Sequence, residues 1–434
     1  MAVNDNESPP HVSANDRPGR TPVAALRHRD FSIYWSGSVL SLVGSQFTTV
    51  AMAWQIYELT NSPLELGLLG LARGAPMLVL LLFGGLLADA VNRRHLMMAT
   101  QIAQMCVSAT LAVLTLAGRV TPAVLYAASL FLALFSALEQ PARTAIIPNL
   151  VPRSDLTNAL ALSGTQRHLA TIIGPSLAGL LLARSGATFC YAVDAASWLA
   201  MLAALAMMRP LPQAAGGRSA LSTKALREGV EFVWTHPVIL SMMALDFGQN
   251  FFGSGRALLP IYARDILNVG PQGLGLLYAA TSAGALAMGT VMSIRSQTRR
   301  AGTWVLVSVS AYGIFTAIFG LSHSFWLSFL MLAAAGAANT VSFVLRNTIN
   351  QLLTPDEIRG RVTSVNSMFT NTGPQLGQFE AGAVASVIGA VGATAMGGLL
   401  VTSIAAGLAA VRSVRKFEVR EIAPAKAHEV PARA

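Results

Sequence analysis

Twelve apolar stretches follow one another along this chain, and they constrain its fold more than any other feature. About 20 apolar residues in a helix are needed to cross the hydrocarbon core of a membrane. Turn-forming or charged residues separate the stretches. The pattern predicts an all-α integral membrane protein with 12 transmembrane helices. The stretches cover residues 31–59, 64–89, 95–117, 122–142, 156–183, 187–208, 238–263, 271–294, 302–321, 325–345, 359–388 and 391–411.

The composition excludes a water-soluble protein. Charged residues make up 12% of the chain, which is about half of the share typical of soluble domains. Hydrophobic residues make up 53%, and a soluble chain of this composition would expose large apolar patches. The 37 glycines fit helices that pack closely in lipid.

Positive charge is distributed unevenly between the connections. All but six of the 30 Lys and Arg fall in the termini or in alternate connections. Cytoplasmic loops carry such an excess, so we expect a multi-pass protein of the inner (plasma) membrane with both termini cytoplasmic. The net charge of +10 then reflects orientation and contact with anionic lipid, and not nucleic-acid binding. The exceptions are Arg119, Arg184 and Arg264 in other connections and Arg73, Arg167 and Arg256 within spans.

The two halves of the chain resemble one another. Gly174-Pro175 and Gly373-Pro374 lie 199 residues apart, and similar segments precede both pairs. Between the halves, segment 223–235 has an apolar and a charged face, which predicts a helix on the membrane surface. We expect two pseudo-symmetric six-helix bundles. The predicted domains are a disordered cytoplasmic tail at 1–28, an N-terminal bundle at 29–208, a linker at 209–237, a C-terminal bundle at 238–411 and a tail at 412–434.

The segment GLLADAVNRR, residues 85–94, lies where the second span leaves the membrane. Its spacing resembles the signature of the major facilitator superfamily of transporters, although Asn92 replaces the usual glycine and Ala90 a usual basic residue. The resemblance implies that the aspartate braces a cytoplasmic gate against a basic partner. The residues that carry the spacing are Gly85, Asp89, Arg93 and Arg94, and the candidate partners are Arg143, Arg359 and Arg361.

The fifth span contains Gly174, Pro175 and Gly179, which predict a bent helix that packs closely. This segment resembles a motif of the exporting branches of the superfamily. Four further stretches resemble the branch of enterobactin exporters and macrolide-efflux transporters. The resemblance implies proton-coupled efflux of a small amphipathic molecule, drug-like or siderophore-like. The alternative is a proton symporter that imports a small polar metabolite. The four stretches are 223–237, 258–267, 273–289 and 376–393.

Charged residues inside the membrane are costly and are therefore candidates for function. Asp246 and Asn250 share one face of the seventh span. Burial of a carboxyl group favours its protonated form near neutral pH, so Asp246 is the first candidate for the proton carrier. Alternatively, Asp246 is a structural carboxylate paired with Arg167 or Arg256. Gln46 and Thr49 are expected to contact substrate or each other.

Arg73 and Glu380 lie at similar depths, since each is eight or nine residues from the outer end of its span. The second and eleventh spans are neighbours in the major facilitator fold. We therefore predict an Arg73–Glu380 ion pair that closes the outer gate in the inward-open state.

The sequence contains no phosphate-binding loop, nucleophile motif or His/Cys cluster. We expect neither an enzyme nor a bound cofactor or metal. The expected partners are a small-molecule substrate, protons and membrane lipid, and the expected state is a monomer.

Overall fold

The computed structural model describes residues 23–88, 93–209, 223–294, 300–356, 358–415 and 417. Across these ranges the regular structure is helical, and none of them contains a strand. Eight of the described helices are long and apolar enough to cross a membrane. The fold is therefore the predicted all-α membrane class. The main helices are α1 (Arg29–Thr60), α2 (Pro63–Ala88), α3 (Arg93–Leu116), α4 (Pro122–Ile146), α5 (Leu156–Met207), α6 (Thr223–Thr235), α7 (Pro237–Phe252), α9 (Gly270–Ile294), α10 (Ala301–Leu321), α11 (Phe325–Leu353) and α12 (Arg359–Ala409).

Helices α5 and α12 each contain two spans joined by a tight turn. The backbone turns at Gly186 (φ 79°, ψ 178°) in α5 and at Gly389 (φ 77°, ψ 163°) in α12. Positive φ is strained for residues with a Cβ atom but open to glycine. The apolar pattern places span boundaries at both glycines, and their separation of 203 residues matches the offset between the halves.

The seventh span is interrupted, whereas the apolar stretch 238–263 predicts one continuous helix. Helix α7 ends at Phe252, and short irregular helical segments continue the span. The hydroxyl group of Tyr312 donates to the Gly253 carbonyl at 2.8 Å and so satisfies backbone at the break. Irregular backbone at membrane depth is tolerated where it is buried in protein or lines a cavity. The segments are η4 (Gly255–Leu258), α8 (Leu259–Ile261) and the π-helix η5 (Tyr262–Ile266).

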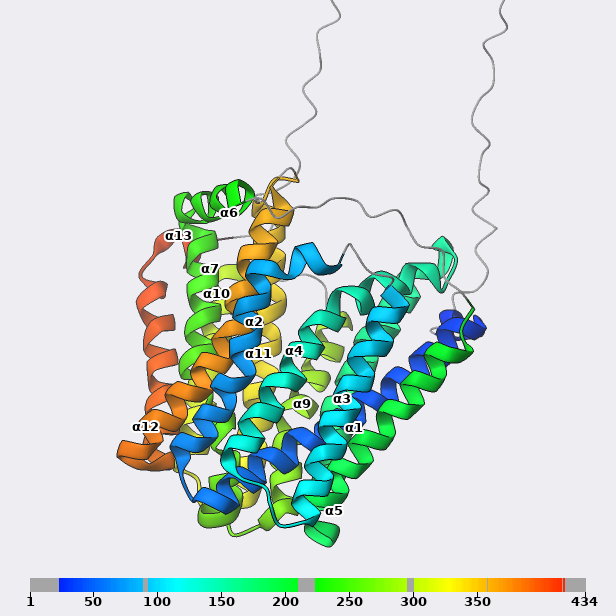
Figure 1. The fold of residues 1–434 in the computed structure, drawn as a ribbon. Coiled ribbons are helices and arrows are strands. Elements are labelled where there is room, and N and C mark those ends of the chain that lie inside the picture. Colours follow the sequence, from blue (N-terminus) through cyan, green and yellow to red (C-terminus); the bar gives the residue numbers. More distant parts are fainter. Residues whose placement is uncertain are drawn as a thin grey trace, which may run out of the picture.

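The helices form two groups. In one, α5 packs along α1 and α3, and α4 packs along α2 and α3. In the other, α10 packs along α11 and α12, and α9 packs along α11. In Figure 1, α1, α3 and α5 lean away from α7, α10 and α12 toward the end of the molecule where α6 lies. We call this end, which also carries η1 (Ala24–Arg27) and α13 (Arg412–Arg415), the basic side.

Glycine contacts hold the two groups together in the half of the molecule away from the basic side. Between α2 and α12, a Cβ atom on Gly67 would lie 3.1 Å from the Cα atom of Gly382. Between α5 and α9, a Cβ atom on Gly179 would lie 2.8 Å from the Cα atom of Gly275. Small residues allow membrane helices to approach this closely. Helices α2 and α9 both begin on the side opposite the basic side, so these contacts close that side.

The surface segment 223–235 forms helix α6 over the same residues. Val233 is buried and packs with Ile239 of α7 and Val362 of α12. Trp234 is 70% exposed. An aromatic side chain exposed on a helix beside the bundle is typical of a helix at a membrane interface.

We expect Gly284→Ala to destabilise the protein. A Cβ atom on Gly284 of α9 would lie 1.8 Å from the carbonyl oxygen of Ala333 in α11. Overpacking of this kind costs about 1–3 kcal/mol, more than the gain in helix propensity. The matched control is Gly289→Ala in the same helix, whose nearest neighbour would be 3.9 Å away. Thermal unfolding in detergent should show a lower melting temperature for Gly284→Ala alone; equal melting temperatures would contradict this packing.

Candidate functional site

A cavity of about 460 Å³ lies between the two groups of helices, near the middle of the spans. Its wall includes Gln46 and Thr49 of α1, Asn250 of α7, and Asn339 of α11. An adjoining cavity of about 480 Å³ shares Thr49 and Arg73 with the first. Volumes of this order accommodate small organic molecules.

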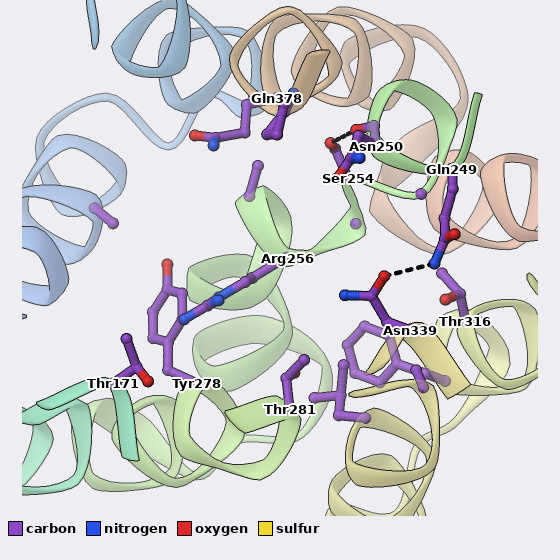
Figure 2. Close-up of a pocket in the computed structure, with 18 of the residues that line it drawn as sticks. Thr171, Gln249, Asn250, Ser254, Arg256, Tyr278, Thr281, Thr316, Asn339 and Gln378 are labelled. Carbon is purple, nitrogen blue, oxygen red and sulfur yellow. Dashed lines mark hydrogen bonds between the residues drawn. The ribbon is translucent and has the colours of Figure 1, made fainter. Parts of the chain in front are cut away.

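Arg256 enters the cavity from the break in the seventh span (Figure 2). Its guanidinium carbon lies 5.1 Å from the centre of the Tyr278 ring, a cation–π contact. Gln249 and Asn339 line the same cavity and are joined by a hydrogen bond of 2.9 Å. Gly253 and Gly255 flank the break, and this glycine pair is the sequence signal that could have located it.

Arg73 lines both cavities and does not pair with Glu380. No ion pair within 4 Å joins these two described residues, so the predicted outer-gate pair is wrong for this structure. Helices α2 and α12 are neighbours as expected. Gln378, two positions before Glu380, faces Gly70 of α2. Two helical positions differ by about 200° in direction, so Glu380 points elsewhere although its depth matches.

Asp246 is buried within the second group and pairs with Arg346 of α11 at 2.9 Å. Its carboxylate also accepts hydrogen bonds from Thr370 of α12 at 2.9 Å and from Asn250 at 3.2 Å. Neither of the partners considered from the sequence, Arg167 and Arg256, contacts it. Arg346 is one of the residues that sequence reasoning missed: it follows directly after the stretch 325–345, whereas α11 continues to Leu353.

Arg167 does not line the cavity. It lies on α5 with an exposed side chain, and neither described cavity includes it. Gln46 and Thr49 do line the cavity. They do not hydrogen-bond to one another, because the Thr49 hydroxyl donates to the Ser45 carbonyl at 2.9 Å within its own helix.

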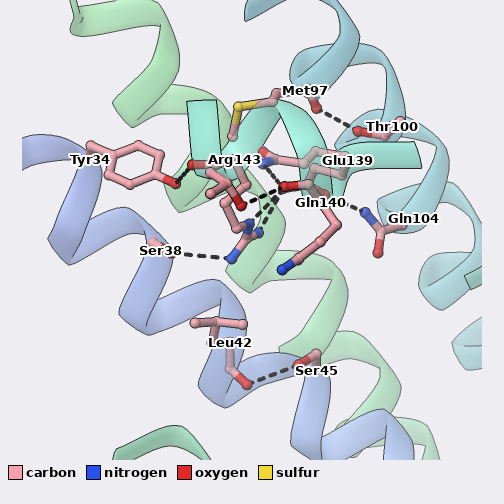
Figure 3. Close-up of polar contacts among 12 residues, drawn as sticks. Tyr34, Ser38, Leu42, Ser45, Met97, Thr100, Gln104, Glu139, Gln140 and Arg143 are labelled. Atoms are coloured by element: carbon pink, nitrogen blue, oxygen red, sulfur yellow. Dashed lines mark hydrogen bonds and ion pairs between the residues drawn. The ribbon is translucent and has the colours of Figure 1, made fainter. Parts of the chain in front are cut away.

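Arg143 belongs to a buried polar network in α4 (Figure 3). It pairs with Glu139 at 2.6 Å and donates to the Ser38 hydroxyl of α1 at 3.3 Å. Gln101 and Gln104 of α3 each donate to Glu139 at 3.0 Å. Arg143 is thus committed to Glu139, a buried carboxylate that the sequence analysis did not single out.

A second buried carboxylate, Asp194 of α5, joins three helices. It accepts hydrogen bonds from Thr48 of α1 at 2.6 Å and from Ser108 of α3 at 2.7 Å. Asp194 also contributes to the wall of the adjoining cavity, although it is only 1% exposed. The first group is therefore held by polar contacts as well as by apolar packing.

The described candidate gate residues on the basic side each have at least one described partner, and Asp89 lies outside the described residues. Arg361 forms an ion pair with Glu228 of α6, and Arg359 pairs with Asp356. In the continuation of the motif, Arg93 donates to the Ala145 carbonyl at 3.4 Å and Arg94 to the Ala206 carbonyl at 3.2 Å. Gly85 lies in α2, close to its end.

Polar contacts join the two groups on the side opposite the basic side. The Tyr57 hydroxyl of α1 donates to Asp265 in η5. The guanidinium group of Arg264 lies 5.6 Å from the centre of the Tyr57 ring. These contacts cross between the two groups of helices.

The glycine-proline pairs of the two halves occupy equivalent places. A Cβ atom on Gly174 would lie 2.6 Å from the Gln46 side chain of α1. A Cβ atom on Gly373 would lie 3.4 Å from the Asn250 side chain of α7. Pro175 lies inside α5, as expected for the bent helix. The fifth span thus contacts the first as the eleventh contacts the seventh, which supports a duplicated architecture.

No cluster of three potential metal ligands occurs in the part of the chain that the structure describes. Two groups of membrane-spanning helices around a cavity of this size are the arrangement expected of a transporter of the major facilitator type. The chain belongs to the transmembrane secretion effector family, whose model matches residues 20–433.

Curated relatives and solved structures agree with this class. The enterobactin exporter EntS of Escherichia coli O81 (strain ED1a) is 28% identical over 373 residues, which cover 84% of this chain and 86% of that protein. EntS of Citrobacter koseri is 26% identical, covering 86% and 89%. The nucleoside transporter NupG has the same fold, with a TM-score of 0.69 at 14% identity over 90% of this chain and all of that chain. A bacterial homologue of the lysosomal transporter Spinster has a TM-score of 0.67 at 14% identity, covering 91% and 98%.

We expect the Asp246–Arg346 pair to show strong coupling. Asp246→Asn leaves Arg346 buried without a counter-charge, which should cost about 3–5 kcal/mol of stability. Arg346→Gln should cost a similar amount, and the double variant should recover most of the loss. The control pair is Asp356→Asn with Arg359→Gln, an exposed ion pair worth at most about 1 kcal/mol. Denaturation of the purified variants measures the free energy of unfolding of each. Additive losses for Asp246→Asn and Arg346→Gln would rule out the coupling.

Proposed function

We propose that this protein exports a small amphipathic molecule across the inner membrane by alternating access, in exchange for protons. The observation that carries the proposal is the cavity between two groups of helices, which glycine contacts bring together on the side opposite the basic side. The names of the relatives, enterobactin exporters, support efflux as the direction.

The geometry corresponds to an inward-open state if the basic side faces the cytoplasm, as the distribution of Lys and Arg favours. The glycine contacts between α2 and α12 and between α5 and α9 then form the closed outer gate. Closing the basic side would require the two groups to rock, with residues 209–237 linking the bundles 29–208 and 238–411. Both termini would be cytoplasmic, and the protein would work as a monomer surrounded by lipid.

Proton coupling requires a carboxyl group whose protonation changes contacts near the cavity. Asp246 is the first candidate, because it joins three helices through Arg346 and Thr370 while Asn250 connects it to the cavity wall. Protonation would weaken its attraction to Arg346 and loosen α11 and α12 from α7. Glu139, which holds Arg143, is the equivalent candidate in the first bundle.

Everted membrane vesicles test this proposal. With the vesicle interior acidic, wild-type protein should accumulate at least one of a panel of amphipathic dyes, and a protonophore should abolish the accumulation. Asp246→Asn should reduce gradient-driven accumulation at least about tenfold. Its dye exchange at equal pH should persist, which separates lost coupling from lost folding. Asp356→Asn, at an exposed position, is the control.

If the protonophore does not reduce the accumulation of any dye in the panel, proton-coupled export is excluded. Gradient-driven accumulation found only in right-side-out vesicles would indicate import instead. Unchanged coupling in Asp246→Asn would remove this residue from the proton pathway.

A further inference from the structure

The cavity between the bundles contains positive charge without a matching negative charge. Its lining includes the guanidinium groups of Arg73 and Arg256 and no carboxylate. Among the described residues, neither arginine has an acidic group within 4 Å. Arg256 lies over the Tyr278 ring, which attracts its charge but does not neutralise it (Figure 2).

The adjoining cavity does not supply the missing counter-charge. Asp194 is the acidic residue in its lining. That carboxylate is 1% exposed and is held by the hydroxyl groups of Thr48 and Ser108. Arg73, which lines both cavities, makes no ion pair with it. Among the described residues, the linings of the two adjoining cavities therefore contain two arginines and one buried carboxylate.

Arg256 is exposed to the cavity and Arg73 is half-buried, and the two arginines held inside single bundles differ from them in having a carboxylate partner. Arg143 pairs with Glu139 at 2.6 Å, and Arg346 pairs with Asp246 at 2.9 Å. An uncompensated charge inside the membrane is costly and is kept where it serves a function. The contrast indicates that a ligand provides the counter-charge for Arg73 and Arg256. Guanidinium groups suit this role because their planar donors match carboxylate-like oxygens.

The other residues that line the cavity indicate the chemistry of the remainder of such a ligand. The aromatic side chains of Tyr278 and Phe319 and the apolar side chain of Leu332 line the same cavity. Amide groups of Gln46 and Asn339 supply additional hydrogen-bonding positions. The lining therefore suits an amphipathic molecule, with aromatic or aliphatic surface next to its acidic group.

We propose that the cavity selects an amphipathic organic anion, whose carboxylate, sulfonate or phenolate group binds between Arg73 and Arg256 while its ring system packs near Tyr278. This inference rests on the proposed transport function, because it names the chemical class of the transported solute. It predicts that acids bind and that cations of the same shape are rejected.

Two xanthene dyes with the same ring system test the charge preference directly. Carboxyfluorescein is an anion and rhodamine 6G is a cation. Equilibrium binding of each dye to purified full-length protein is measured by fluorescence polarisation at equal pH, without a proton gradient. Carboxyfluorescein should bind at least about tenfold more tightly than rhodamine 6G. Arg256→Gln and Arg73→Gln should each weaken its binding by about tenfold or more, and Arg256→Lys should retain part of it.

Arg184→Gln, which removes an exposed arginine outside the cavity, should leave binding unchanged. Because Arg73 and Arg256 have no ion-pair partners among the described residues, their replacement should lower the melting temperature much less than Arg346→Gln does, and this measurement separates lost binding from misfolding. Tighter binding of rhodamine 6G, or wild-type binding of carboxyfluorescein in both glutamine variants, would overturn the inference.

The proposed anion site and the proposed transport function can be contradicted separately. Gradient-driven export of rhodamine 6G together with weak carboxyfluorescein binding would keep the exporter and discard the anion site. Arginine-dependent carboxyfluorescein binding in a protein whose vesicles ignore the proton gradient would keep the anion site and discard proton-coupled export.

Discussion

Direct backbone contact between the two bundles is the constraint on which the rest of the structure depends. Gly67 meets Gly382 and Gly179 meets Gly275 at separations that leave no room for larger side chains. Lipid provides no hydrophobic force between helices, so close packing of small residues must hold them together. In the proposed transport cycle these contacts would act as a pivot, about which the ends on the basic side separate and approach. The proposed gate and rocking motion both depend on these contacts.

The second organising feature is that each bundle pairs an arginine with a carboxylate in its interior. Arg143 and Arg346 occupy related places on α4 and α11, 203 residues apart, and each is neutralised inside its own bundle. The Asp246–Arg346 pair joins α7 to α11. The contacts of the Arg143–Glu139 pair with Gln101, Gln104 and Ser38 join α4 to α3 and α1, and in the proposed cycle each bundle would move as a unit. Charge left without a partner is found where the two bundles meet, at Arg73 and Arg256. A ligand bound there would contact both bundles, so its binding energy could change their relative position.

The sequence predicted the helices far better than the contacts between them. Hydropathy located the spans and the turns at Gly186 and Gly389, because each depends on local residues alone. The search for polar and charged residues within spans also pointed to Asn250 and Arg256, which do line the cavity. Arg346 was missed because the apolar stretch ends at residue 345, whereas the helix continues through a charge that is paired. Glu139 lies inside the stretch 122–142, and its pairing with Arg143 became visible only in the structure. The Arg73–Glu380 pair failed because depth along a helix does not determine the direction of a side chain around it.

Paired distance measurements with spin labels test whether the two bundles rock about the glycine contacts. One pair, at Ser154 and Thr235, reports the basic side; the other, at Arg119 and His323, reports the opposite side, and all four positions are exposed. Double electron–electron resonance in lipid nanodiscs is recorded across a range of pH, with and without carboxyfluorescein. The account predicts a second population in which the basic-side distance shortens while the opposite distance lengthens. Distances that stay fixed under every condition, or that change in the same direction, would contradict it.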